Sequence, residues 1–113
     1  REEAMYLQYF VNNYRSHHRD PATGLYFWLD DNAIGVDNDP CTYGRPPRST
    51  ASIYRNCLMH RELLALAYLL ERLGLQGAAD AYRNDATSLR DAVRQHCWDE
   101  RDGFFYSVDL NLE

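Results

Sequence analysis

One pattern of residues occurs twice in this chain, 79 positions apart, and this repeat limits the folds that the chain can adopt. In each copy a histidine, an aspartate and a glycine recur in order, and two aromatic residues in register follow the glycine. The matched pairs are His17 and His96, Asp20 and Asp99, Gly24 and Gly103, Tyr26 and Phe105, and Phe27 and Tyr106. Self-similarity at a fixed long offset is typical of arrays of supersecondary units. We therefore expect a repeated unit of a helix, a D-x-x-x-G turn and a short aromatic extended segment.

Three segments have the apolar spacing of helices, with apolar residues every three or four positions over residues 2–17, 49–73 and 77–97. The first is followed by Asp20-Pro21, and proline ends a helix. The second is apolar in almost every direction, which predicts burial on most sides, and Ser49 or Thr50 is its expected cap. The third has one apolar stripe and is expected to lie on the outside.

The connection between the second and third segments is short, which predicts an antiparallel hairpin. The fold class we expect is therefore all-α, built of helical hairpins. Its parts are an outer helix over 2–17, a loop over 20–48, an inner helix over 49–73, an outer helix over 77–97 and a terminal extended segment over 99–113. The second copy of the repeat has no inner helix after it, so we expect residues 1–113 to be part of a larger domain whose remainder is their partner.

Composition excludes several classes of function. The 12 basic residues are all arginine, the 17 acidic residues give a formal net charge of -5, and no basic stripe is present, which argues against nucleic-acid binding. No run of 18 apolar residues occurs, so no membrane partner is expected. The three cysteines, Cys41, Cys57 and Cys97, form no C-x-x-C pair and are expected to be buried thiols. Their low, odd number favours a reducing, cytoplasmic location, and no cofactor is predicted.

Residues 28–48 form a long connection with no regular pattern, and long connections of this kind are usually functional. They concentrate four aspartates, two asparagines, arginines and aromatic residues. Aromatic faces stack on sugars while carboxylates and amides bind hydroxyl groups, so one hypothesis is a carbohydrate site. A second is a calcium loop at Asp37-Asn38-Asp39, although the closing Glu of the 12-residue calcium pattern is missing. A third is a structural loop whose Asp and Asn side chains make turns. The residues alone leave all three open.

The segment Ile34-Gly35-Val36-Asp37-Asn38-Asp39-Pro40, preceded by Trp28, resembles the S-G-x-D-N-x-P motif of glycoside hydrolase family 63 and its trehalase-like relatives. The resemblance implies an (α/α)6 toroid of six helical hairpins. It also implies an inverting α-glycosidase that acts on a carbohydrate substrate with an Asp acid and a Glu base. Relatives of this kind include processing α-glucosidases, trehalases, and mannosylglycerate- or glucosylglycerate-type hydrolases.

By this resemblance the general acid is Asp37. Trp28, Asn38, Tyr43 and Arg45 are expected to line the substrate pocket beside it, because they lie in the same loop. No metal ligand is implied.

Glu62 and Glu71 lie among apolar residues of the second helical segment and are predicted to be surface or salt-bridge groups. The general base is therefore expected outside this chain, and the 113 residues alone are expected to be inactive. The alternative function is a non-catalytic helical-repeat module that binds a carbohydrate or a protein.

Overall fold

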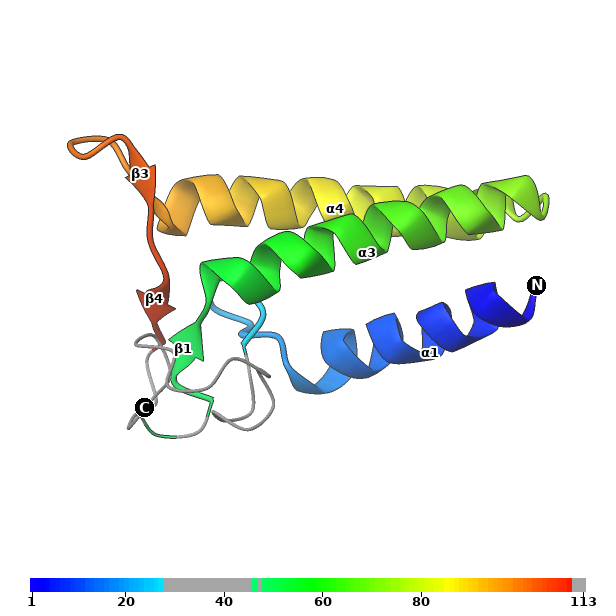
Figure 1. Cartoon of the computed structure of the whole chain (residues 1–113), viewed down its shortest axis with the longest axis horizontal. Helices are drawn as coiled ribbons and strands as arrows, with labels where there is room; N and C mark the ends of the chain where they lie inside the picture. Colours follow the sequence, from blue (N-terminus) through cyan, green and yellow to red (C-terminus); the bar gives the residue numbers. More distant parts are fainter. Residues whose placement is uncertain (28–45, 47, 111–113) are drawn as a thin grey trace.

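The computed structural model describes residues 1–27, 46 and 48–110, and most of these residues are helical. Helix α1 spans Glu2–His17, α3 spans Ile53–Arg72 and α4 spans Gln76–His96. Helices α3 and α4 run antiparallel side by side, and α1 lies along α3 (Figure 1). The all-α prediction and the predicted hairpin are therefore confirmed. None of the described helices is long and apolar enough to cross a membrane.

Four short strands gather at one end of the helices (Figure 1). Strand β1, Thr50–Ala51, pairs antiparallel with β4, Val108–Asp109, while β2, Trp98–Asp99, pairs antiparallel with β3, Phe104–Phe105. The β1–β4 pairing ties the residues before α3 to the segment that follows α4.

Helix α3 begins later than the sequence predicts. The cap is Ser52, whose hydroxyl oxygen accepts a hydrogen bond from the backbone N–H of Arg55 at 3.4 Å. Predicting Ser49 or Thr50 as the cap was wrong, because pairing with β4 holds Thr50 in an extended conformation and the helix can start only beyond it. At the other end α3 stops at Arg72, and Gly74 has a φ of 80°. That left-handed conformation suits glycine, which is common just after the end of a helix.

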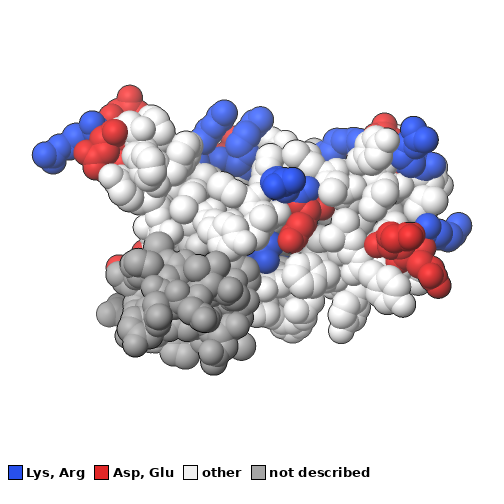
Figure 2. Space-filling model, in the orientation of Figure 1, with Lys and Arg blue, Asp and Glu red and all other residues white. Residues whose placement is uncertain are grey.

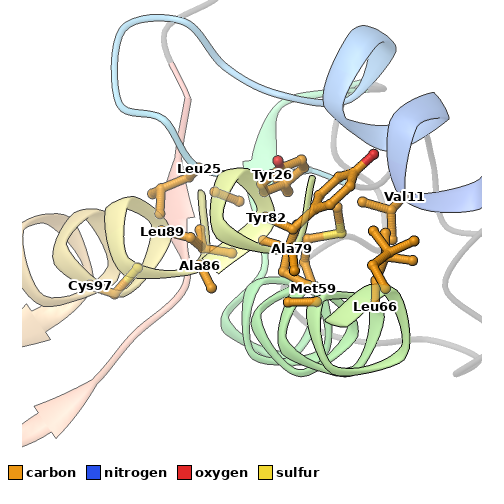
Figure 3. Packing of buried hydrophobic residues seen from close by; sticks show 14 residues of the cluster. Val11, Leu25, Tyr26, Met59, Leu66, Ala79, Tyr82, Ala86, Leu89 and Cys97 are labelled. Carbon is orange, nitrogen blue, oxygen red and sulfur yellow. The ribbon is translucent and has the colours of Figure 1, made fainter. Parts of the chain in front are cut away.

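The hydrophobic core lies mainly between α3 and α4 (Figure 3). Alanines on the buried face of α4 allow the two helices to approach closely, and Val11 of α1 and Leu25 close the core from the side. The fully or almost fully buried members on the two helices are Met59, Leu63, Leu66, Ala67 and Leu70 of α3, and Ala79, Tyr82, Ala86 and Leu89 of α4. The predicted stripe of α4 therefore faces the core.

Helix α3 is less enclosed than its apolar sequence predicts. Leu64 and Tyr68 are exposed, because α1 and α4 cover only part of the helix surface. At its first turn, Arg55 and Asn56 are instead buried. In the described part of the chain α3 is therefore covered only on the sides that face α1 and α4, and its burial on most sides stays a prediction for the larger domain.

The two copies of the repeat form the same turn, with the same hydrogen bonds. The Gly24 N–H donates to the Asp20 carbonyl at 2.8 Å, and the Gly103 N–H donates to the Asp99 carbonyl at 2.8 Å. In each copy the aspartate side chain also accepts a hydrogen bond from the backbone N–H three residues later, at Thr23 and at Asp102. Both glycines have positive φ, 79° and 64°, where side chains are disfavoured.

The aromatic segments after the two turns also match. The Phe27 N–H donates to the His18 carbonyl at 2.9 Å, and the Tyr106 N–H donates to the Cys97 carbonyl at 2.8 Å. The isolated bridge between Arg19 and Tyr26 has its counterpart in the β2–β3 pair Trp98 and Phe105. The predicted repeat of helix, turn and aromatic extended segment is therefore present in the structure.

Candidate functional site

The predicted acid Asp37 and the predicted pocket residues Trp28, Asn38, Tyr43 and Arg45 lie outside the described residues. The alternative calcium loop at residues 37–39 lies outside them too. The structure does describe the residues that flank the loop. These are Tyr26 and Phe27 before it, and Arg48 and the residues that follow after it.

Asn56 fixes the backbone immediately before the loop. Its side-chain oxygen accepts a hydrogen bond from the Tyr26 N–H at 2.8 Å, and its side-chain NH2 donates to the Tyr26 carbonyl at 2.8 Å and to the Ser52 carbonyl at 2.8 Å. The asparagine is fully buried. Because a buried amide that satisfies both backbone groups of a residue determines its position, this clamp sets where the loop leaves the helical framework.

Next to this clamp, Arg55 is buried with its charge paired. Its guanidinium lies 2.8 Å from a carboxylate oxygen of Glu62 and 4.5 Å from the centre of the Tyr14 ring. The predicted salt-bridge role of Glu62 is confirmed, and Glu71 pairs with Arg83 at the far end of the hairpin. Two turns of α3 thus hold a buried ion pair next to the Asn56 clamp.

His18, which follows α1, packs against the residues before the loop. Its ring lies 4.6 Å from the Tyr14 ring and 5.8 Å from the Phe27 ring, measured between centroids. Burial lowers the pKa of His18, and the nearby positive charge of Arg48 lowers it further. Both effects favour the neutral imidazole. Arg48 itself has a φ of 63°, a strained conformation for a residue with a side chain. We call Tyr14, His18, Phe27, Arg55 and Glu62 the platform cluster.

The cysteines differ from their predicted environment. Cys97 is buried as expected, and burial raises the pKa of its thiol to about 11, so it stays protonated. Cys57 is exposed, since the side of α3 that carries it is not covered by α1 or α4; its predicted burial is wrong. Cys41 lies outside the described residues. In the ranges 1–27, 46 and 48–110, no three His, Cys, Asp or Glu side chains are grouped closely enough to hold a metal ion.

Sequence reasoning missed the two polar residues at the start of α3. Asn56 stands three residues before Met59 and seven before Leu63, on the same buried stripe. An amide at a core position of a helix is a signal that it binds backbone groups of another segment. Its partner Tyr26 lies 30 residues away in the sequence and could not be read from local spacing.

A model of the mannosylglycerate hydrolase MGH1-like glycoside hydrolase domain matches residues 5–112. The chain belongs to this glycoside hydrolase family. The loop motif predicted glycoside hydrolase family 63 or a trehalase-like relative; the match confirms a glycoside hydrolase domain. A comparison with curated protein sequences finds no match.

The fold of this chain is similar to part of a solved structure described as a sialidase. The TM-score is 0.82 at 22% sequence identity, and the similarity covers 97% of this chain and 10% of that one. At this identity the likeness establishes the fold alone. The chain thus has the fold of the matched segment and spans about a tenth of the length of that relative.

Proposed function

We propose that this chain forms part of an inverting α-glycoside hydrolase and supplies its general acid, Asp37. The observation that carries the proposal is the family match over residues 5–112, which includes the loop whose D-N motif resembles that of trehalase-like enzymes. The substrates are α-glucosides or related oligosaccharides. The (α/α)6 toroid and the relation to glycoside hydrolase family 63 are parts of the same proposal.

In this mechanism Asp37 protonates the glycosidic oxygen while a glutamate activates a water molecule on the opposite face of the sugar. Inverting enzymes hold the two carboxyl groups roughly 6.5–9.5 Å apart, which leaves room for that water. An acid of this kind works when an enclosed site keeps it protonated at the working pH. Trp28, Asn38, Tyr43 and Arg45 line the sugar pocket beside it.

The base comes from another part of the larger domain. Glu62 has its carboxylate engaged by Arg55, and Glu71 has its carboxylate engaged by Arg83, so neither is suited to activate water. The 113 residues alone are therefore inactive, and the remainder of the domain is their partner.

The test is Asp37→Asn in the longest natural polypeptide that contains these residues. Hydrolysis of an α-glucoside should fall by about 10²- to 10⁴-fold, the usual contribution of acid catalysis. Hydrolysis of the matching α-glucosyl fluoride should fall far less, since fluoride leaves without protonation. Asp31→Asn, in the same loop, is the matched control.

Equal losses on both substrates would show that Asp37 is not the acid. Near-normal turnover on both would remove Asp37 from the acid role, and absence of turnover by the unaltered polypeptide would instead favour the non-catalytic binding module. The product anomer, followed by NMR in the first minutes of reaction, tests inversion separately.

A further inference from the structure

The turn of the second repeat contains the only Asp-Gly pair in the sequence, Asp102-Gly103. Both residues are exposed, in the turn that joins β2 to β3. Glycine has no side chain to shield its backbone nitrogen. A Cβ placed on Gly103 would meet nothing within 4 Å, so the surroundings do not shield that nitrogen either. The side chain of an aspartate in front of such a nitrogen can react with it, and this turn is therefore a candidate site of chemical modification.

The reaction is an isomerisation that needs no reagent other than water. The Gly103 nitrogen attacks the side-chain carboxyl carbon of Asp102, and the new C–N bond closes a succinimide ring. One carboxyl oxygen leaves as water together with the amide proton. A water molecule then opens the ring by breaking the bond between the Asp102 main-chain carbonyl carbon and the Gly103 nitrogen. The chain now continues through the side chain, and the residue is isoaspartate with unchanged mass.

Two hydrogen bonds of the folded turn oppose this reaction. The Gly103 N–H donates to the Asp99 carbonyl at 2.8 Å. The Tyr106 hydroxyl donates to a carboxylate oxygen of Asp102 at 2.9 Å. Ring closure consumes the amide proton of the first bond and the carboxylate of the second, so both bonds are lost on the way to the succinimide. The fold therefore slows a reaction that the sequence favours.

The first copy of the repeat has neither the reactive pair nor the hydroxyl group. Thr23 and Phe27 stand there where the second copy has Asp102 and Tyr106. The turn itself is the same, because in both copies the glycine N–H donates to the carbonyl of the aspartate four residues earlier. The Tyr106 hydroxyl is therefore not required by the turn, and it is present in the copy that carries the reactive pair.

We propose that Asp102 is a site of isoaspartate formation and that the Tyr106 hydroxyl restrains the reaction. The product carries a free α-carboxylate, which is the group that isoaspartyl methyltransferases methylate with S-adenosylmethionine. Isomerisation lengthens the main chain by one carbon directly before β3, so it also disturbs the pairing of β3 with β2. The inference does not depend on the catalytic role of Asp37.

The test ages the 113-residue chain at neutral pH, folded in one series and unfolded in urea in the other. Isoaspartate is measured by methyl transfer from S-adenosylmethionine with a purified isoaspartyl methyltransferase, and it is located by mass spectrometry with electron-transfer fragmentation. Tyr106→Phe removes the hydroxyl and keeps the ring, while Asp102→Thr introduces the residue of the first copy. Tyr68→Phe, at an exposed tyrosine of α3, is the matched control. Circular dichroism checks that each variant folds.

We expect isoaspartate at residue 102 of the folded chain, formed about three- to tenfold faster in Tyr106→Phe, which is the effect of losing one hydrogen bond. In urea the two chains should react equally. Asp102→Thr should abolish isoaspartate in this turn, and Tyr68→Phe should leave its rate unchanged.

The proposal is overturned if residue 102 isomerises in urea but not in the folded chain, or if Tyr106→Phe reacts no faster than the original chain. Should Tyr106→Phe fail to fold, the original chain alone still decides. Equal rates for its folded and unfolded forms would then show that the folded turn imposes no restraint.

Discussion

At the scale of single residues, the most consequential feature is the buried amide of Asn56. It satisfies two backbone groups of Tyr26 and one of Ser52 and is itself fully buried. Removing one partner of a buried hydrogen bond costs more than the bond contributes, because the group left behind has no water to bind. The position of the backbone just before the loop thus depends on the Asn56 side chain.

Asn56→Ala should lower the free energy of unfolding by about 2–4 kcal/mol, because it leaves backbone groups of Tyr26 unpaired. Urea unfolding followed by circular dichroism measures the change. Asn84→Ala, on the exposed face of α4, is the matched control and should stay within about 0.5 kcal/mol of the original chain. Similar values for the two variants would contradict the clamp.

The surroundings of His18 predict how the free energy of unfolding changes with pH. Its pKa is lowered in the folded chain, first by burial and then by Arg48, so the unfolded chain binds a proton more readily. The free energy of unfolding therefore rises with pH. This contribution is lost as the pH falls through the pKa of the histidine in the unfolded chain, near 6.5. Urea unfolding at pH 7.5 and pH 5.5 should show lower stability at pH 5.5, and His18→Gln should reduce that difference. His17→Gln, at the exposed neighbour, controls for loss of a histidine from the same turn. A pH difference that His18→Gln leaves unchanged would exclude His18 as its source.

At the scale of elements, α1 is held to the hairpin by polar contacts as well as by Val11. Arg15 pairs with Asp85 of α4 at 2.7 Å, and its guanidinium lies 5.1 Å from the centre of the Tyr82 ring. The Tyr82 hydroxyl in turn donates to the Asn12 side chain at 2.9 Å. These contacts join α1 to α4.

A double-mutant cycle on Arg15→Ala and Asp85→Ala should give a coupling of about 0.5–1 kcal/mol, the upper part of the range for partly exposed pairs. Arg90 and Asp91 form a more exposed pair on α4 and serve as the control cycle, with an expected coupling near zero. Thermal unfolding measures both cycles, at low and at high salt. Coupling that does not decrease in high salt would argue against an ionic origin.

The elements also show where sequence reasoning succeeds and where it fails. The range of α1, the hairpin and the repeated turns follow from local spacing, because each depends on residues a few positions apart. The start of α3 does not follow from local spacing, because the β1–β4 pairing that delays it joins Ala51 to Val108, which is far away in the sequence. The platform cluster was missed for the same reason, and the predicted site residues lie outside the described part of the chain.

At the scale of the whole molecule, the described surface carries mixed charge with exposed apolar areas. In the view of Figure 2, acidic and basic side chains are interspersed and no extended basic surface is present. Large aromatic side chains lie open on α1, where Tyr6 and Tyr9 are 75% and 79% exposed. Apolar surface of this extent typically marks an interface.

The two copies of the repeat differ in how much apolar surface they leave exposed at the same position. Helix α4 buries Leu89 against the hairpin, while its counterpart on α1, Phe10, is 43% exposed. The described chain therefore has two helices of the α1 kind and one of the α3 kind. The same position of the repeat is part of the core on α4 and part of the surface on α1.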